Sequence, residues 1–142
     1  MNILISACLI GCACRYDGKS KPYPAVEQLQ KKHTLIPICP EIYGGLPTPR
    51  PPSEIVGDSV QNSAGEDVTA AYMRGAAEAL RLAKLFGCKV AVLKAKSPSC
   101  GKGMVYDGTF SRTLTSGDGV TVALLQKNGI TVYTEDEIEA IL

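Results

Sequence analysis

Residues 90–101 read VAVLKAKSPSCG: an apolar run, residues 90–93, passes into a short polar loop that presents Cys100. The same pattern occurs twice more, where the apolar residues 3–5 precede Cys8 and the apolar residues 35–38 precede Cys39. If these runs are parallel strands, their carboxyl ends lie at one edge of a sheet, where open α/β folds bind their ligands. The three thiols would then meet, which predicts a metal or iron–sulfur centre.

The composition restricts the class of protein. With 142 residues the chain has the size of one domain, so we expect a single domain over residues 1–142. The 15 Lys and Arg nearly balance the 14 Asp and Glu. This balance gives no global attraction to nucleic acid or to an anionic membrane, and it argues against intact tRNA as a substrate. Oligomeric state is not readable from these residues.

The cysteine content points to a reducing compartment. The longest apolar stretch near the start, residues 3–10, is too short to span a bilayer and has no positive charges before it. A disulfide framework would need a secreted, loop-rich chain. We therefore expect a cytoplasmic protein whose six cysteines stay reduced.

The hydrophobic pattern predicts alternating strands and helices. Expected strands cover residues 2–7, 34–38, 89–93 and 130–133, and expected helices cover residues 22–32, 72–86, 119–127 and 135–142, with Asp67 as a candidate cap. Prolines in residues 39–53 predict a long, stiff loop without regular helix. Residues 55–67 suggest a strand and a polar turn, or a small hairpin, and residues 101–117 suggest an irregular excursion. This order predicts an α/β fold, a three-layer Rossmann-like domain with a mainly parallel sheet, although the strand order cannot be read.

Three dispersed cysteines favour a reactive centre over a structural zinc site. Structural zinc usually takes four ligands, often in paired short spacings, and the chain has no C-x-x-C pair. A [4Fe–4S] cluster normally takes four cysteines, so three would leave one iron free for a substrate. A zinc-stabilised binding module without catalysis remains the alternative. A thiol-redox protein is disfavoured, because such proteins carry C-x-x-C at a helix start.

The other three cysteines allow other interpretations. Cys8, Cys12 and Cys14 form the pattern C-x-x-x-C-x-C, which differs from the C-x-x-x-C-x-x-C of radical enzymes. A free cysteine also behaves as a small buried hydrophobe. That interpretation suits Cys88, at the start of a strand, best.

Few other side chains near these thiols can move protons. Glu41, two residues after Cys39, is the nearest carboxylate; a general acid/base and an ordinary loop carboxylate are equally consistent with its position. Ser97 and Ser99 could donate to cluster sulfides, to a bound hydrosulfide or to turn amides. His33 is the only histidine, so there is no triad.

Seven stretches, spread over nearly the whole chain, carry a resemblance to a known family. They are residues 6–11 (SACLIG), 15–18 (RYDG), 39–41 (CPE), 44–50 (GGLPTPR), 97–101 (SPSCG), 106–110 (YDGTF) and 117–121 (GDGVT). In these stretches together the sequence resembles the thiouracil desulfidases.

The resemblance implies a [4Fe–4S] cluster held by Cys8, Cys39 and Cys100, with one iron not ligated by protein. That iron would take the thiocarbonyl sulfur of a thiolated pyrimidine such as 2-thiouracil, 4-thiouracil or 4-thio-UMP. The implied reaction is a non-redox hydrolysis that replaces sulfur by oxygen and releases hydrosulfide. By the same resemblance, Glu41 would activate water, and Ser97, with Ser99, would assist proton transfer or position the leaving sulfur.

Two features lie outside this resemblance. The extra thiols Cys12 and Cys14 depart from the family pattern. The basic residues expected in loops could gather around a nucleotide phosphate, or could equally be solvated loop charges. They are Arg15, Lys19, Arg50, Lys96 and Lys102.

Overall fold

Four parallel strands form the central sheet of the computed structural model, which describes residues 1–142. They are β1 (Asn2–Ser6), β2 (Thr34–Ile38), β5 (Val90–Leu93) and β8 (Thr131–Thr134), in the spatial order β2-β1-β5-β8. Because β2 and β5 lie on opposite sides of β1, the winding of the chain reverses there. The loops that follow the strands diverge at such a switch point and leave a crevice for a ligand.

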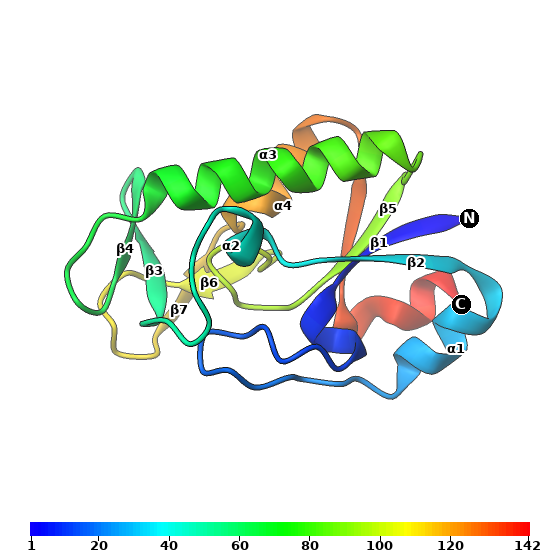
Figure 1. Cartoon of the computed structure of the whole chain (residues 1–142), viewed down its shortest axis with the longest axis horizontal. Helices are drawn as coiled ribbons and strands as arrows, with labels where there is room; N and C mark the ends of the chain where they lie inside the picture. The colour runs from blue at the N-terminus through cyan, green and yellow to red at the C-terminus, as the bar shows by residue number, and fades with distance from the viewer.

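Helices cover both faces of this sheet (Figure 1). The helix α1 (Ala25–Lys32) and the closing 3₁₀ helix η2 (Glu135–Ile141) pack on one face, and α3 (Thr69–Leu85) and α4 (Val120–Lys127) pack on the other. Successive residues of a strand point to opposite faces, so Ile3 and Ile5 join the core under α1, while Leu4 joins the core under α3 and α4. The predicted three-layer α/β fold is therefore confirmed.

Two predictions about the loops are wrong in detail. Residues 39–53 contain a four-residue helix, α2 (Pro40–Tyr43). It forms because Pro40 is its first residue, where the missing N–H is not needed and the fixed φ suits a helix. Residues 101–117 are not wholly irregular, since β6 (Met104–Tyr106) and β7 (Leu114–Ser116) pair as an antiparallel hairpin.

The boundaries of other elements also differ from the predictions. The hairpin suggested for residues 55–67 exists, but it begins earlier, with β3 (Ser53–Val56) and β4 (Ser59–Asn62). The carboxylate of Asp67 accepts from the Thr69 amide at 2.9 Å, while the residue that caps α3 is Val68. Both hairpins lie at the same end of the molecule (Figure 1). None of the helices combines the length and the apolar character that a membrane crossing requires.

A pair of glycines brings α2 into backbone contact with α3. A Cβ atom on Gly75 would lie 1.8 Å from the carbonyl oxygen of Pro40, and one on Gly44 would lie 2.0 Å from the carbonyl oxygen of Ala71. No side chain fits in either gap. The two glycines therefore determine how closely Glu41, on α2, approaches the rest of the molecule.

Gly75→Ala is expected to push α2 away from α3 and to lower the free energy of unfolding by about 3 kcal/mol, the upper range for overpacking. Thermal unfolding followed by circular dichroism measures this loss. Ala77→Ser, at an exposed position on the same helix, is the control and should lower the free energy of unfolding by no more than about 0.5 kcal/mol, the difference in helix propensity. An unchanged melting temperature for Gly75→Ala would show that the two helices can separate at no cost.

Candidate active site

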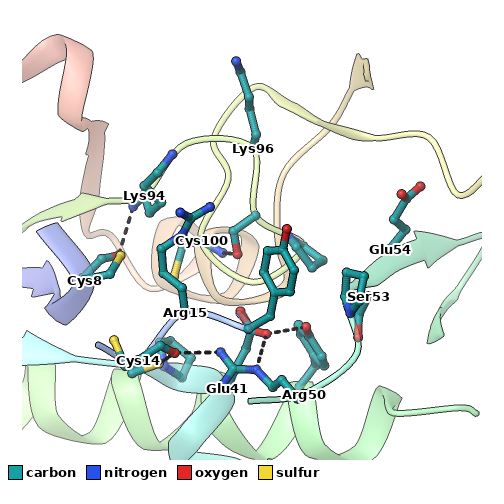
Figure 2. Close-up of a pocket in the computed structure, with 18 of the residues that line it drawn as sticks. Cys8, Cys14, Arg15, Glu41, Arg50, Ser53, Glu54, Lys94, Lys96 and Cys100 are labelled. Atoms are coloured by element: carbon teal, nitrogen blue, oxygen red, sulfur yellow. Dashed lines mark hydrogen bonds and ion pairs between the residues drawn. The ribbon is translucent and has the colours of Figure 1, made fainter. Parts of the chain in front are cut away.

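One cavity of about 480 Å³ opens at the carboxyl edge of the sheet, and Cys8, Cys39 and Cys100 all line it. Cys8 lies in the 3₁₀ turn η1 (Ala7–Ile10) that follows β1, Cys39 directly follows β2, and Cys100 lies in the loop after β5. Figure 2 shows Cys8 and Cys100 on the wall of this space with Glu41 beside it. The structure thus brings together the three thiols that the sequence places after strands.

The remaining cysteines differ in position. Cys14 is buried and also lines the cavity, Cys12 is exposed outside it, and Cys88 is buried in the core beneath α3 and α4. All six cysteines are free thiols. No three Cys, His, Asp or Glu side chains come close enough together to hold a single metal ion. The thiols instead surround a space, which suits a group larger than one ion.

Backbone turns hold the Cys100 thiol at the cavity. The Ser97 hydroxyl oxygen accepts from the amides of Ser99 and Cys100, each at 3.1 Å, and the Gly101 amide donates to the Ser97 carbonyl at 2.8 Å. Ser97 lines the cavity. Ser99 is fully buried behind the wall, where its hydroxyl pairs with that of Thr121 at 2.8 Å.

Two of the three thiols, those of Cys39 and Cys100, are in surroundings that favour their neutral form. Burial raises the pKa of Cys100 to about 12, against the opposing hydrogen bonds of Ser6 and Ser99 to its thiol. The hydrogen bond with the Cys14 thiol, followed by burial, raises the pKa of Cys39. Binding of a metal or cluster must therefore displace protons from these sulfurs, which couples cofactor loading to pH.

Glu41 is held from two sides. Its Oε1 atom accepts from the Tyr72 hydroxyl at 2.7 Å and from Arg50 Nε at 3.1 Å. The Glu41 side chain is 17% exposed, whereas that of Arg50 is 4% exposed. Both bonds end on the same oxygen, so Oε2 remains available to a water or substrate in the cavity.

Arg50 joins three segments of the site, and it is not a free phosphate ligand. Besides Glu41, its guanidinium donates to the carbonyl of Cys14 at 2.9 Å, the carbonyl of Pro47 at 3.2 Å and the Thr48 hydroxyl at 3.0 Å. Sequence reasoning missed this pairing. It also placed Tyr72 only on a core face, although a buried tyrosine hydroxyl signals a polar partner.

Of the basic side chains in the predicted loops, only some face the cavity as free cations. Lys102 pairs with Glu137 at 3.0 Å, and neither it nor Lys19 lines the cavity. Lys94 lines it but is neutralised by Glu135 at 3.0 Å. The unpaired cations at the cavity are Arg15, Lys96 and Arg112, of which the sequence analysis had not selected Arg112.

The mouth of the cavity contains strained backbone. Lys96, Phe110 and Arg112 are the non-glycine residues with positive φ, at 72°, 57° and 60°, and all three line the cavity. The loop that carries Phe110 and Arg112 is held by the buried Glu54, whose Oε1 accepts from the amides of Gly108 at 3.0 Å and Phe110 at 3.1 Å. Strain of this kind persists where the surroundings enforce it and clusters at functional sites.

The donor set fits an iron–sulfur cluster, because cysteine thiolates are the usual ligands of such clusters and the cavity gives three of them room to surround one. A parallel α/β sheet with these thiols and a fixed carboxylate at its carboxyl edge defines a cofactor-dependent α/β enzyme. The family model of the 2-thiouracil desulfurases matches residues 3–137, and the chain belongs to this family.

The chain is also similar to two known proteins. A solved structure of a [4Fe-4S]-dependent thiouracil desulfidase, TudS, is 44% identical, with a TM-score of 0.93 over 99% of this chain and 94% of that one. The uncharacterized protein YbbK of Bacillus subtilis (strain 168) is 41% identical over 150 residues, covering 99% of both chains. The resemblance and the fold class that the sequence indicated are confirmed.

Proposed function

We propose that the chain is a [4Fe–4S]-dependent desulfidase that hydrolyses the C–S bond of a thiolated pyrimidine. The observation that carries the proposal is the convergence of Cys8, Cys39 and Cys100 on one cavity that also contains a fixed Glu41. These three thiolates would hold the cluster and leave one iron without a protein ligand. When bound, the cluster would supply a Lewis acid for the thiocarbonyl sulfur, which would polarise the C–S bond.

Glu41 would act as the general base. Its Oε1 is anchored by Tyr72 and Arg50, which leaves Oε2 to accept a proton from the water that attacks the ring carbon. Arg50 compensates the carboxylate charge, and Tyr72 fixes the carboxylate plane. The water oxygen replaces the sulfur, the products are the oxo-pyrimidine and hydrosulfide, and no electron acceptor is needed.

Ser97 would direct a proton toward the leaving sulfur. Its oxygen already accepts two amide hydrogens, so its own O–H hydrogen is available to the cavity. Ser99 is committed to Thr121 and to the Cys100 thiol. Its role would be to position that thiol rather than to touch the substrate.

A direct assay tests this function. We treat residues 1–142 as one domain, so the full chain is the protein to be assayed. Anaerobic reconstitution should yield about four irons and four sulfides per chain. The loaded protein should release hydrosulfide and the oxo-pyrimidine from 2-thiouracil, 4-thiouracil or 4-thio-UMP. A colourless, zinc-loaded protein with no sulfide release would support the zinc-stabilised module instead.

The free thiols agree with action in a reducing compartment such as the cytoplasm.

The cations at the cavity mouth favour a nucleotide over a free base. Arg112→Ala is expected to raise KM for 4-thio-UMP by about 10-fold or more, because a hydrogen bond to a charged group contributes about 1.5–3 kcal/mol. KM for 4-thiouracil should not change. Steady-state kinetics on both substrates provide the measurement.

The control for Arg112→Ala is Arg81→Ala. Arg81 is an exposed arginine on α3 that pairs with Glu78 and does not line the cavity. This variant should keep both KM values. If Arg112→Ala changed the two KM values equally, the phosphate would not bind there.

A further inference from the structure

Four thiols line the cavity, one more than the site described above employs. The additional one is Cys14, which is 8% exposed. Its neighbour Cys12 is exposed and lies outside the cavity, so the turn between them separates an inward thiol from an outward one. Figure 2 shows Cys14 at the cavity beside Arg50 and Glu41.

Contacts on both sides hold Cys14 in place. Its carbonyl accepts from Arg50 Nη2 at 2.9 Å and from the Cys39 thiol at 3.7 Å, and its amide donates to the Cys12 carbonyl at 2.9 Å. The buried guanidinium of Arg50 thus links Cys14 to Glu41. Cys14 therefore lines the same cavity as Glu41, the residue proposed to serve the reacting carbon, and is joined to it through Arg50.

We propose that Cys14 is a fourth cluster ligand, whose thiolate binds the iron left free by Cys8, Cys39 and Cys100 whenever no substrate is present. This inference rests on the proposed function. A [4Fe–4S] cluster normally takes four cysteines, and the cavity offers four. The exchange is not a redox step: the Cys14 thiol would give up its proton to water as the S–Fe bond forms. When the substrate sulfur displaces it, the S–Fe bond would break and the thiolate would take a proton from water.

The role predicts a labile iron once Cys14 is removed. Wild type, Cys14→Ala, Cys14→Ser and Cys12→Ala are reconstituted anaerobically and treated with EDTA, and the irons lost per chain are counted over time. Cys14→Ala should lose one iron per chain at least tenfold faster than wild type and Cys12→Ala. Added sodium hydrosulfide should change the visible absorption of Cys14→Ala at concentrations at least tenfold lower than those needed for wild type, because no thiolate competes for the iron.

Equal iron loss and equal hydrosulfide sensitivity in wild type and Cys14→Ala would overturn the inference and leave Cys14 a small buried core residue. If Cys14→Ala fails to fold, as judged by its thermal melt, Cys14→Ser keeps the size and a hydrogen-bonding group, and its iron loss decides. A wild type that assembles no cluster would overturn both this inference and the proposed function. If wild type assembles a stable cluster and the Cys14 variants lose iron and respond to hydrosulfide as wild type does, only the role of Cys14 would be overturned.

Discussion

Glu41→Gln is expected to lower the rate of hydrosulfide release by about 10²–10⁴-fold, the contribution typical of a general base, and to leave the cluster intact. The amide oxygen of glutamine can still accept from Tyr72 and Arg50, so the side chain should stay in place. It cannot accept a proton from water. Initial rates of sulfide release, compared at equal iron content, measure the effect.

Glu27→Gln is the control for Glu41→Gln, because Glu27 is exposed on α1 and does not line the cavity. Its activity should equal that of wild type. A Glu41→Gln enzyme that keeps its iron and most of its rate would remove Glu41 from the chemistry. One that loses its iron as well would mean that the carboxylate contributes to the structure of the site.

Cys100→Ala is expected to prevent stable cluster assembly and to reduce sulfide release to the uncatalysed level. The thiol lies on a loop pinned by Ser97, and none of the other thiols that line the cavity is carried by that loop. Iron and sulfide analysis, together with absorption in the visible range, measures the loss independently of activity.

Cys88→Ala is the matched control, since Cys88 is buried but lies in the core away from the cavity. It should lower thermal stability slightly and retain full iron content. A brown Cys100→Ala protein with four irons per chain would show that Cys100 does not ligate the cluster. The three-thiol assignment would then be wrong.

Much of the fold follows from local patterns. Strands buried on both faces read as continuous apolar runs, and for that reason residues 3–5 and 90–93 identify the core of the sheet. Residues 35–38 are apolar too, although β2 lies at the edge of the sheet and Pro37 is exposed. The cysteine after each run then falls at the carboxyl edge, because parallel strands share that edge. The candidate ligands could therefore be selected without knowing the strand order.

Other parts of the site depend on contacts between distant segments. Arg50 reads as a free loop cation until the fold places it against Glu41 and the carbonyl of Cys14. The 101–117 segment reads as irregular because its strands are three residues each, too short for a period of two to be visible. Loop conformations of this kind are decided by packing and buried hydrogen bonds, which have no sequence periodicity.

The sequence by itself determined the α/β class and the three cysteines that follow apolar runs, because both are written in consecutive residues. The alternation of strands and helices along the chain also indicated a mainly parallel sheet. Only the tertiary structure decided the strand order, the close contact of α2 with α3 at Gly75, and the anchoring of Glu41 by Tyr72. It also separated Cys14, inside the cavity, from Cys12 outside it. These features arise from contacts between residues far apart in the chain, and such contacts exist only once the chain has folded.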